Sequence, residues 1–575
     1  MAGLLIVMNK QPKGIIKNII IIFLLTLATA GAFGAYLTLT VEEPPHEIAF
    51  AAADQPTVPV YVRTDNGMEE IGSITRGSRV NIYRKEEEID GKIYIRLLGG
   101  SKLFDSEAAG GESADEDASK YYMVDNNLVS VISKVVKEDE VYVRTPATVY
   151  AGESGPEIAS FAPKGSALKV TGYDKLLPDG RVNKYRVSYS EGESTKEGFV
   201  YGRYTVQSKE DADAVYKPVY KKVKNDNYGY NLYGGRAADL DYYPYERVSI
   251  EGNEFCSDAR AMYINGAAAV NPGSYVKLIK STKCNAVVID IKDGYITYKS
   301  KVAKKLSPKS YKTAYASVKD FKKGVDAYRE TGAYLIGRIV VFNDPLYAKD
   351  HPEDCIKYGS DRGWPSAFSR NVWEYNVKLA IEAAREFGFN EIQFDYVRFP
   401  ESSYEMSKSK KADFKNAYDE EKGQAVQNFC MYARDMLHEE GVYMSVDVFG
   451  ESAYGYMTAY GQYWTGISNV VDAISAMPYT DHMGSDGSWE TPYKTMLAWS
   501  KKAKKQQDKL ETPAAARTWI TGYNTPHWNP TVDYNAKKLK DQVKALEKAG
   551  LSGGFIPWNA SSDLSKYRQY KSIWD

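Results

Sequence analysis

Short apolar segments alternate with longer amphipathic ones from about Glu254 to the end of the chain, and this alternation most constrains the fold. Eight apolar segments are predicted as β-strands: 261–264, 286–290, 335–342, 391–394, 443–448, 473–477, 518–521 and 554–557. Helical patterns lie between them, such as 372–387, 420–440 and 532–549. Eight β–α units in about 320 residues are typical of a (β/α)8 TIM barrel. An open doubly wound sheet is the alternative, but it would need a glycine-rich turn that Asn265–Ala269 does not provide.

The charge balance excludes one class of partner and the aromatic content favours another. The chain has 575 residues, with 74 basic and 75 acidic side chains and a net charge of −1. Nucleic-acid binding usually needs a basic excess, so nucleic acid is not expected as a partner. Aromatic residues make up 13% of the chain, with 47 Tyr against 18 Phe. A tyrosine ring with its hydroxyl suits wet surfaces and sugar faces, although it is also common on exported proteins.

An uncharged apolar run from Ile19 to Val41 follows three lysines near the N-terminus. Its 23 residues are enough for a spanning helix and exceed the apolar core of a signal peptide. We therefore predict a cytoplasmic segment at 1–18 and a signal anchor at 19–41, with the bulk of the chain extracellular at the cell membrane. The alternative is a cleaved signal peptide, because Ala28–Ala30 and Ala30–Ala32 resemble cleavage sites.

Two similar β-rich stretches precede the barrel. Residues 54–132 and 141–206 each contain short alternating strands and end in similar strings, and Val-Tyr-Val-Arg-Thr occurs at 60–64 and again at 141–145. We predict two copies of a small β module that resembles the SH3-like barrels of bacterial cell-wall proteins, with 147–150 as a second possible first strand of the second copy. Residues 105–120 are predicted as a disordered acidic insertion. A tyrosine-rich linker is predicted at 207–253 and the barrel domain at 254–575.

Carboxylates lie where the predicted barrel strands end, which is where TIM-barrel enzymes carry their catalytic groups. Asp395 ends the fourth strand and Asp447 lies near the end of the fifth, with Glu451 just beyond. Two carboxylates facing one cavity are what glycoside hydrolysis needs, one as acid and one as nucleophile or base. Arg398 is predicted to keep Asp395 ionised, with a purely structural salt bridge as the alternative.

Other polar and aromatic residues at the strand ends are predicted to bind substrate. The full predicted set is Asp290, Arg338, Tyr396, Arg398, Tyr479, His482, Trp519 and Trp558. For Asp290 and Asp344 the alternative is a helix N-cap. With only five histidines and no HExxH motif, no metal site and no cofactor are predicted.

Four motifs carry a family resemblance: 285–293, 337–345, 389–400 and 445–450. Over about 258–560 they resemble the barrel domain described as a "putative glycoside hydrolase" in bacterial surface proteins, which is similar to alpha-amylase-type barrels. The resemblance implies Asp395 as nucleophile, with the acid at Asp447 or Glu451. The sequence departs from the family pattern at 477–482 and 517–521. Both segments lie at the predicted rim of the barrel, so we expect a different substrate preference.

Three functions remain open from the sequence. The first is an anchored extracytoplasmic glycoside hydrolase that acts on a cell-wall or surface polysaccharide. The second is a non-catalytic carbohydrate-binding or scaffold protein on the same barrel. The third is a surface adhesin that uses the β modules. The carboxylate pair distinguishes the first from the second, because a binding protein does not need both groups in one cavity.

Overall fold

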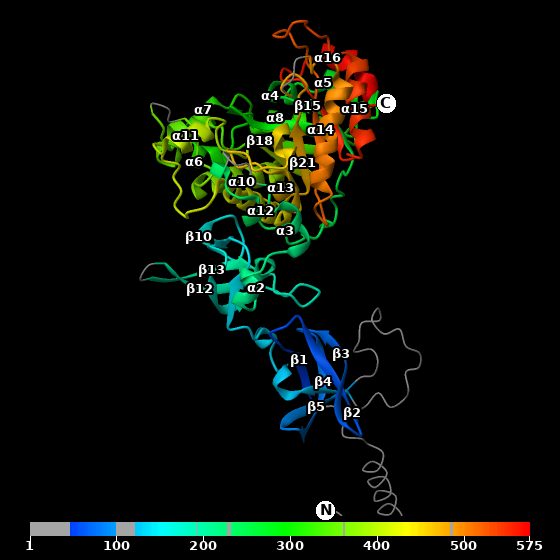
Figure 1. Cartoon of the computed structure of the whole chain (residues 1–575). Coiled ribbons are helices and arrows are strands. Elements are labelled where there is room, and N and C mark those ends of the chain that lie inside the picture. Colours follow the sequence, from blue (N-terminus) through cyan, green and yellow to red (C-terminus); the bar gives the residue numbers. More distant parts are fainter. Residues whose placement is uncertain (1–46, 99–120, 192–193, 227–231, 360–362, 484–486) are drawn as a thin grey trace, which may run out of the picture. The chain divides into compact units, whose positions relative to one another are not determined.

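The computed structural model describes residues 47–98, 121–191, 194–226, 232–359, 363–483 and 487–575 (Figure 1). Contacts divide the described chain into two units: one runs to Asp139 and includes Gly172–Asn183, and the other holds Glu140–Thr171 and Lys184–Asp575. The predicted anchor at 19–41 and the acidic insertion at 105–120 lie outside the described residues. Within the described ranges, no helix is both long and apolar enough to cross a membrane.

The first β module is a seven-stranded sheet. Its strands are β1 (Glu47–Ala51), β2 (Thr57–Thr64), β3 (Gly67–Thr75), β4 (Arg79–Ile89), β5 (Lys92–Leu98), β6 (Tyr121–Val124) and β7 (Leu128–Val129). They are arranged in the order β3-β2-β6-β5-β4-β1-β7. Alternate residues such as Val58 and Val60 are fully buried, so period-two patterning builds one apolar core.

The second β module repeats this arrangement. Its strands are β8 (Glu140–Val143), β9 (Ala147–Tyr150), β10 (Ile158–Ala162), β11 (Ala167–Tyr173), β12 (Lys184–Glu191), β13 (Ser194–Tyr201) and β14 (Thr205–Val206). The order β10-β9-β13-β12-β11-β8-β14 matches the first sheet position by position. The repeated Val-Tyr-Val-Arg-Thr strings therefore occupy non-equivalent strands, β2 and β8. The equivalent of β2 is β9, so 147–150 is the match of Val60–Thr64. The first copy begins with β1, one strand before the predicted start at 54, whereas the second copy begins with β8, close to the predicted start at 141.

The tyrosine-rich stretch after the second module packs against the barrel. It carries two short helices, α2 (Lys209–Asp213) and α3 (Lys217–Val223). The backbone N–H of Asp241 donates to Gln427 Oε1 at 2.8 Å, and Asn469 Nδ2 donates to the Asp241 carbonyl at 3.1 Å. The Tyr245 ring lies 5.0 Å below the Arg434 guanidinium. These buried contacts fix the stretch to the outside of the barrel.

The C-terminal region is a closed barrel of eight parallel strands, as the alternation predicts. The strands are β15 (Ala259–Ile264), β16 (Ala286–Asp293), β18 (Tyr334–Val340), β19 (Glu391–Asp395), β20 (Tyr443–Phe449), β21 (Ala473–Met477), β22 (Ala515–Thr521) and β23 (Gly554–Trp558). Each strand pairs with its sequence neighbour, and β15 pairs with both β16 and β23, which closes the barrel. The short β17 (Tyr295–Ile296) adds an antiparallel pairing to β16.

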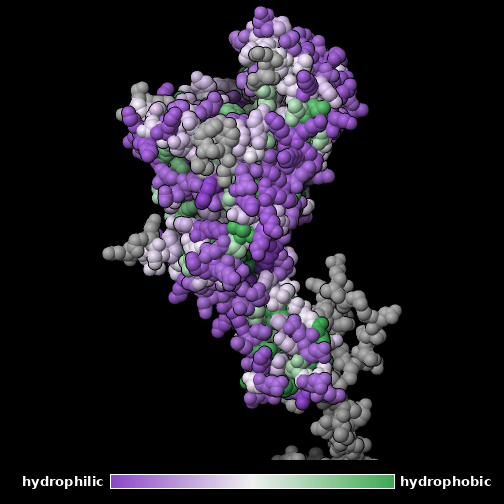
Figure 2. All heavy atoms as spheres, in the orientation of Figure 1, coloured by the Kyte–Doolittle hydropathy of each residue, from purple (hydrophilic) through white to green (hydrophobic). Residues whose placement is uncertain are grey.

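Helices follow the strands and surround them (Figure 1). They are α4 (Gly266–Ala269), α5 (Gly273–Lys280), α6 (Lys301–Leu306), α7 (Pro308–Thr313), α8 (Val318–Arg329), α9 (Pro345–Asp350), α10 (Arg370–Phe387), α11 (Ser403–Ser409), α12 (Lys422–Glu439), α13 (Trp464–Val470), α14 (Pro492–Gln507), α15 (Ala536–Ala549) and α16 (Leu564–Gln569). Helix α10 ends at Gly388, whose φ of 65° places it in the left-handed region that glycine adopts without strain. The visible face is mostly hydrophilic, with small scattered apolar patches (Figure 2).

The barrel interior combines an apolar core with a completely buried ion pair between β22 and β19. Inward side chains such as Val288, Ile336 and Ile556 are fully buried. Arg517 on β22 donates to Glu391 on β19 at 2.6 Å, and neither side chain is exposed. Arg517 thus belongs to the barrel core and does not reach the strand ends.

Candidate active site

A cavity of about 1040 Å³ opens where the strands end, and most of the predicted site residues meet there. Nine of the eleven line it: Arg338, Asp395, Tyr396, Arg398, Glu451, Tyr479, His482, Trp519 and Trp558. Asp290 and Asp447 are buried and do not line it. The closed barrel explains the convergence, because the carboxyl ends of all eight parallel strands share one rim.

Arg338 on β18 is the electrostatic centre of the cavity floor. Its side chain is only 3% exposed, and Nη2 donates to Asp395 Oδ2 at 2.6 Å. Nη1 donates to Asp290 Oδ1 at 2.7 Å and to Asp293 Oδ2 at 3.3 Å. A planar guanidinium with five donors can serve three carboxylates at once, which an ammonium could not do with fixed geometry. The arginine therefore holds together the ends of three neighbouring strands.

Asp395 is oriented by the backbone of the next residue as well as by Arg338. The N–H of Tyr396 donates to Asp395 Oδ1 at 2.6 Å. Tyr396 has a φ of 55°, an uncommon left-handed conformation for a residue other than glycine. Such strained residues cluster at functional sites. The carboxylate is therefore held from both sides while still lining the cavity.

Asp447 lies beneath the cavity, contrary to the expectation that it faces the cavity with Asp395. It is completely buried, and Trp519 Nε1 donates to its Oδ1 at 2.7 Å. Its Oδ2 lies 3.6 Å from Arg338 Nε. Burial, and then the neighbouring charge of Asp395, raises the pKa of Asp447 well above its usual value. The sequence could not reveal this, since strand alternation does not say how deep an inward residue lies.

Asp290 and Asp344 separate into two roles. Asp290 accepts a hydrogen bond from the Tyr263 hydroxyl and pairs with Arg338, and burial raises its pKa to about 6. Asp344 is the N-cap of α9, accepting from the N–H of Tyr347 at 2.9 Å, and it pairs with Lys292 at 2.7 Å. The N-cap alternative thus holds for Asp344 only.

Arg398 does not pair with Asp395, although the sequence placed them close together. Its Nη2 donates to Glu401 Oε1 at 3.1 Å, and its guanidinium lies 4.3 Å from the Phe449 ring centroid. The side chain thus lies against Phe449 at the end of β20 and Glu401 in the loop after β19. Arg338, from the preceding strand, is the partner of Asp395 instead.

Glu451 reaches the cavity from a short 3-10 segment after β20. The hydroxyls of Tyr456 and Tyr460 donate to its two oxygens at 2.5 and 2.8 Å. It lines the same cavity as Asp395. Two carboxyl groups from neighbouring strands therefore do face one cavity, but the second is Glu451.

Aromatic rings in or just after the last three barrel strands line part of the cavity wall. Tyr479 stacks on Trp558 at 6.5 Å between ring centroids, and Trp519 meets Trp558 edge-on at 5.4 Å. The sequence reasoning missed Tyr523 and Trp528, which also line the cavity from the loop after β22. Trp528 is 44% exposed and stacks on Trp489. The aromatic content of that loop was the available signal.

His482 lies at the cavity rim, where it pairs with Asp481. Its Nδ1 lies 3.1 Å from Asp481 Oδ1, and this hydrogen bond raises the pKa of His482. Tyr523 donates to the same Asp481 oxygen at 2.7 Å. The arrangement orients polar groups at the entrance to the cavity.

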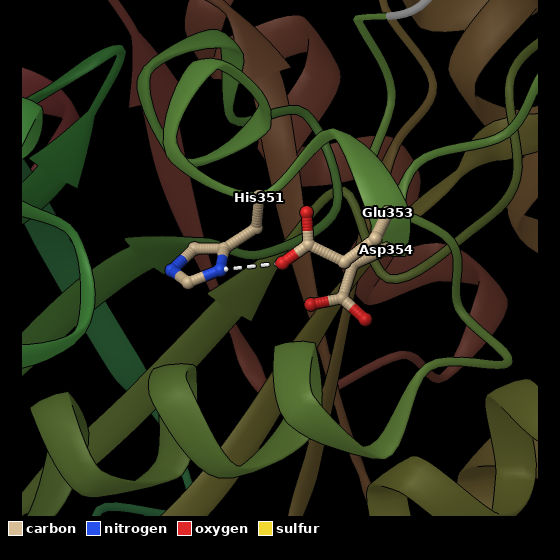
Figure 3. Close-up of side chains that lie close together, drawn as sticks. All are labelled: His351, Glu353 and Asp354. Atoms are coloured by element: carbon tan, nitrogen blue, oxygen red, sulfur yellow. Dashed lines mark hydrogen bonds and ion pairs between the residues drawn. The ribbon is translucent and has the colours of Figure 1, made fainter.

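A second group of acidic and imidazole side chains lies outside the cavity (Figure 3). His351 Nδ1 faces Glu353 Oε1 at 3.1 Å, and His351 Nε2 contacts the Leu306 carbonyl at 2.7 Å. Asp354 accepts from the Tyr347 and Ser369 hydroxyls at 2.9 and 2.7 Å. Because these groups already bind partners within the protein, we interpret the cluster as structural.

The cavity can support acid–base chemistry on a sugar. Asp395 offers a carboxylate fixed by a guanidinium, Glu451 offers a second carboxyl group, and the aromatic wall offers faces on which sugar rings stack. The cavity is large enough for several sugar units, since ligand pockets of about 300–1,000 Å³ hold drug-sized molecules.

Several solved structures are similar to parts of this chain, with low TM-scores. A hypothetical protein from Ruminiclostridium thermocellum is 29% identical, with 32% of this chain and 97% of that chain covered and a TM-score of 0.27. The PgaB (BpsB) glycoside hydrolase domain from Bordetella bronchiseptica is 12% identical, with 55% and 100% covered and a TM-score of 0.41. The spore cortex-lytic enzyme SleL of Bacillus megaterium is 11% identical, with 62% and 80% covered and a TM-score of 0.35. No curated protein matches the chain.

The sequence itself matches one protein family over the barrel. Residues 261–564, more than half of the chain, match the family described as "Putative glycosyl hydrolase domain". The matched range begins in β15 and ends at the start of α16, so it covers the closed barrel and the whole cavity rim. The chain therefore belongs to this glycosyl hydrolase-type family.

Proposed function

We propose that this protein is an extracytoplasmic glycoside hydrolase that acts on a cell-wall or surface polysaccharide. The observation that carries the proposal is the position of Asp395, which lines an aromatic cavity at the strand ends while Arg338 and the Tyr396 N–H hold its carboxylate. Family membership supports the reaction class. We infer the substrate class from the predicted extracytoplasmic location and from the open cavity at the strand ends.

In the proposed reaction, an Asp395 oxygen attacks the anomeric carbon and the leaving oxygen takes a proton from Glu451. Water then hydrolyses the glycosyl-enzyme, with Glu451 acting as the base. We favour Glu451 over Asp447 as the proton donor because Glu451 lines the cavity and Asp447 is completely buried. Asp447 is assigned as a positioning residue that acts through Trp519.

The test is product analysis with the full-length protein and a panel of cell-wall and surface polysaccharides. New reducing ends and shortened oligosaccharides from at least one polymer are the expected result. Tight binding to a polymer without any new reducing end would instead favour a non-catalytic carbohydrate-binding protein. That second function has one observation in its favour, the withdrawal of Asp447 from the cavity.

The extracytoplasmic location rests on the predicted anchor at 19–41. Membrane fractionation followed by N-terminal sequencing tests it. We expect the protein to sediment with membranes and its N-terminus still to lie near Met1. An N-terminus directly after Ala30 or Ala32 would show a cleaved signal peptide and would replace the anchor with secretion.

A further inference from the structure

Carboxylates outnumber cations around the cavity. Two guanidinium groups line it, those of Arg338 and Arg398. Five carboxylates line it as well, and they belong to Asp293, Asp395, Glu401, Glu451 and Asp481. Arg398 is already paired with Glu401, so that pair contributes no net charge. Arg338 alone faces four carboxylates, which belong to Asp290, Asp293, Asp395 and Asp447. Both guanidinium groups are thus fully used, and the five carboxylates outnumber the cations even when His482 is protonated.

Two of these five carboxylates, Glu451 and Asp481, have no arginine or lysine partner among the described residues. Glu451 accepts from tyrosine hydroxyls, and Asp481 accepts from Tyr523 and His482. Asp293 is 44% exposed at its side chain and shares Arg338 with two other acids. A cavity with such an excess attracts cationic ligands and repels anionic ones.

The spacing of these groups fits a polymer better than a single ion. Among the described residues, three acidic or imidazole ligand atoms come together only at His351, Glu353 and Asp354, outside the cavity. The cavity carboxylates therefore do not converge in threes on one point. Aromatic side chains line the same cavity, at Tyr479, Trp558 and Trp528. Such faces bind both sugar rings and ammonium groups.

We propose that the cavity selects a glycan that carries free amino groups, namely a hexosamine polymer whose units are at least partly without N-acetyl groups. The inference rests on the proposed function, because it names the substrate class of the same cavity. The protonated amines would lie against the cavity carboxylates while the sugar rings stack on the aromatic wall. A uronic-acid or phosphate-bearing glycan is disfavoured by the same charges.

The experiment compares binding of three oligosaccharides of equal length to the full-length protein by calorimetry. They are a β-1,4-glucosamine hexamer, the same hexamer after chemical N-acetylation, and cellohexaose, which differ only at carbon 2. The glucosamine hexamer is expected to bind at least about tenfold more tightly, and its advantage should shrink as salt is raised. An oligolysine of the same charge serves as a control for simple charge attraction.

Matched variants connect the preference to the cavity. Glu401→Gln and Asp293→Asn each remove a lining charge and should each weaken binding of the glucosamine hexamer by about two- to fivefold, with little change for the acetylated hexamer. Glu405→Gln makes the same chemical change on an exposed residue outside the cavity and should change neither.

Equal or tighter binding of the acetylated or uncharged hexamer, no binding of the glucosamine hexamer, or equal binding of oligolysine would overturn the inference. Hydrolysis of an acetylated polymer without any preference for amines would overturn it and leave the proposed function standing. A preference for the amine-bearing hexamer without hydrolysis of any polymer would support the charge selection and refute the hydrolase.

Discussion

Arg338 and Asp395 form a buried ion pair at the floor of the cavity, with Nη2 2.6 Å from Oδ2 and each side chain no more than 5% exposed. The same guanidinium contacts Asp290 and Asp293, so one cation organises the carboxyl ends of three strands. Breaking a buried pair costs more than forming it gains, since it leaves an uncompensated charge. Arg338 is therefore expected to matter for stability and for chemistry.

Replacing Arg338 should make stability depend strongly on pH. In Arg338→Met the buried carboxylates lose their cation, so their folded-state pKa values rise above the unfolded ones. Such groups stabilise the fold below the unfolded pKa, near 4, and that contribution is lost as pH rises through the raised values. With Arg338 present, the pKa of Asp290 is already raised to about 6. The variant should be less stable than wild type by about 3–5 kcal/mol at pH 7.5.

The deficit of Arg338→Met should become clearly smaller at pH 5. Urea unfolding at both pH values, followed by tryptophan fluorescence, measures the difference. A deficit that stays the same at pH 5 and 7.5 would mean that packing and not charge accounts for the role of Arg338.

The Arg517–Glu391 pair should stabilise the barrel without affecting substrate binding. Both side chains are completely buried in the core. Arg517→Met leaves a buried carboxylate alone and should lower the free energy of unfolding by about 3–5 kcal/mol. Arg385 pairs with Glu440 at the surface and is 67% exposed, so Arg385→Met is a matched control that should cost about 1 kcal/mol or less. Equal losses of unfolding free energy in the two variants would show that the buried Arg517–Glu391 pair contributes no more than the surface pair.

The second β module should stabilise the barrel on which it packs. Tyr204 donates to Asp435 on α12 at 2.7 Å, and Glu374 on α10 accepts from the Ile158 N–H at 2.8 Å. A fragment that begins at Glu140 should therefore unfold at a higher temperature than one that begins at Gln207, which lacks the module but keeps the tyrosine-rich stretch. Calorimetry of the two fragments gives the comparison, and identical midpoints would show that these contacts contribute nothing.

The two candidates for proton donor can be separated by leaving group. Glu451→Gln should lower turnover of natural glycans by about 10²–10⁴-fold, with much less loss on substrates whose leaving groups need no protonation. Asp447→Asn should show no such dependence on the leaving group, because Asp447 is completely buried and does not line the cavity. The reverse pattern would assign the acid to Asp447.

The strands were predictable and the pairings between their side chains were not. Apolar segments locate β16 or β21 closely, because a parallel strand buried on both faces needs a continuous apolar run. The repeated pentapeptide misaligned the two β modules, since five alternating residues fit any half-buried strand. Likewise, Arg398 is close to Asp395 in sequence, but side-chain direction is set by the turn after β19, which sequence spacing does not encode. Depth within the barrel was equally hidden, as Asp447 illustrates.

The central claim is that Asp395 performs the chemistry, and the most direct measurement is the turnover of Asp395→Asn on a polysaccharide that the wild-type protein cleaves. The amide is nearly isosteric and can still accept from Arg338, but it cannot attack the anomeric carbon. The account predicts a loss of at least about a thousandfold in turnover, with the circular dichroism spectrum and oligosaccharide binding retained. Turnover equal to that of the wild type would contradict the account.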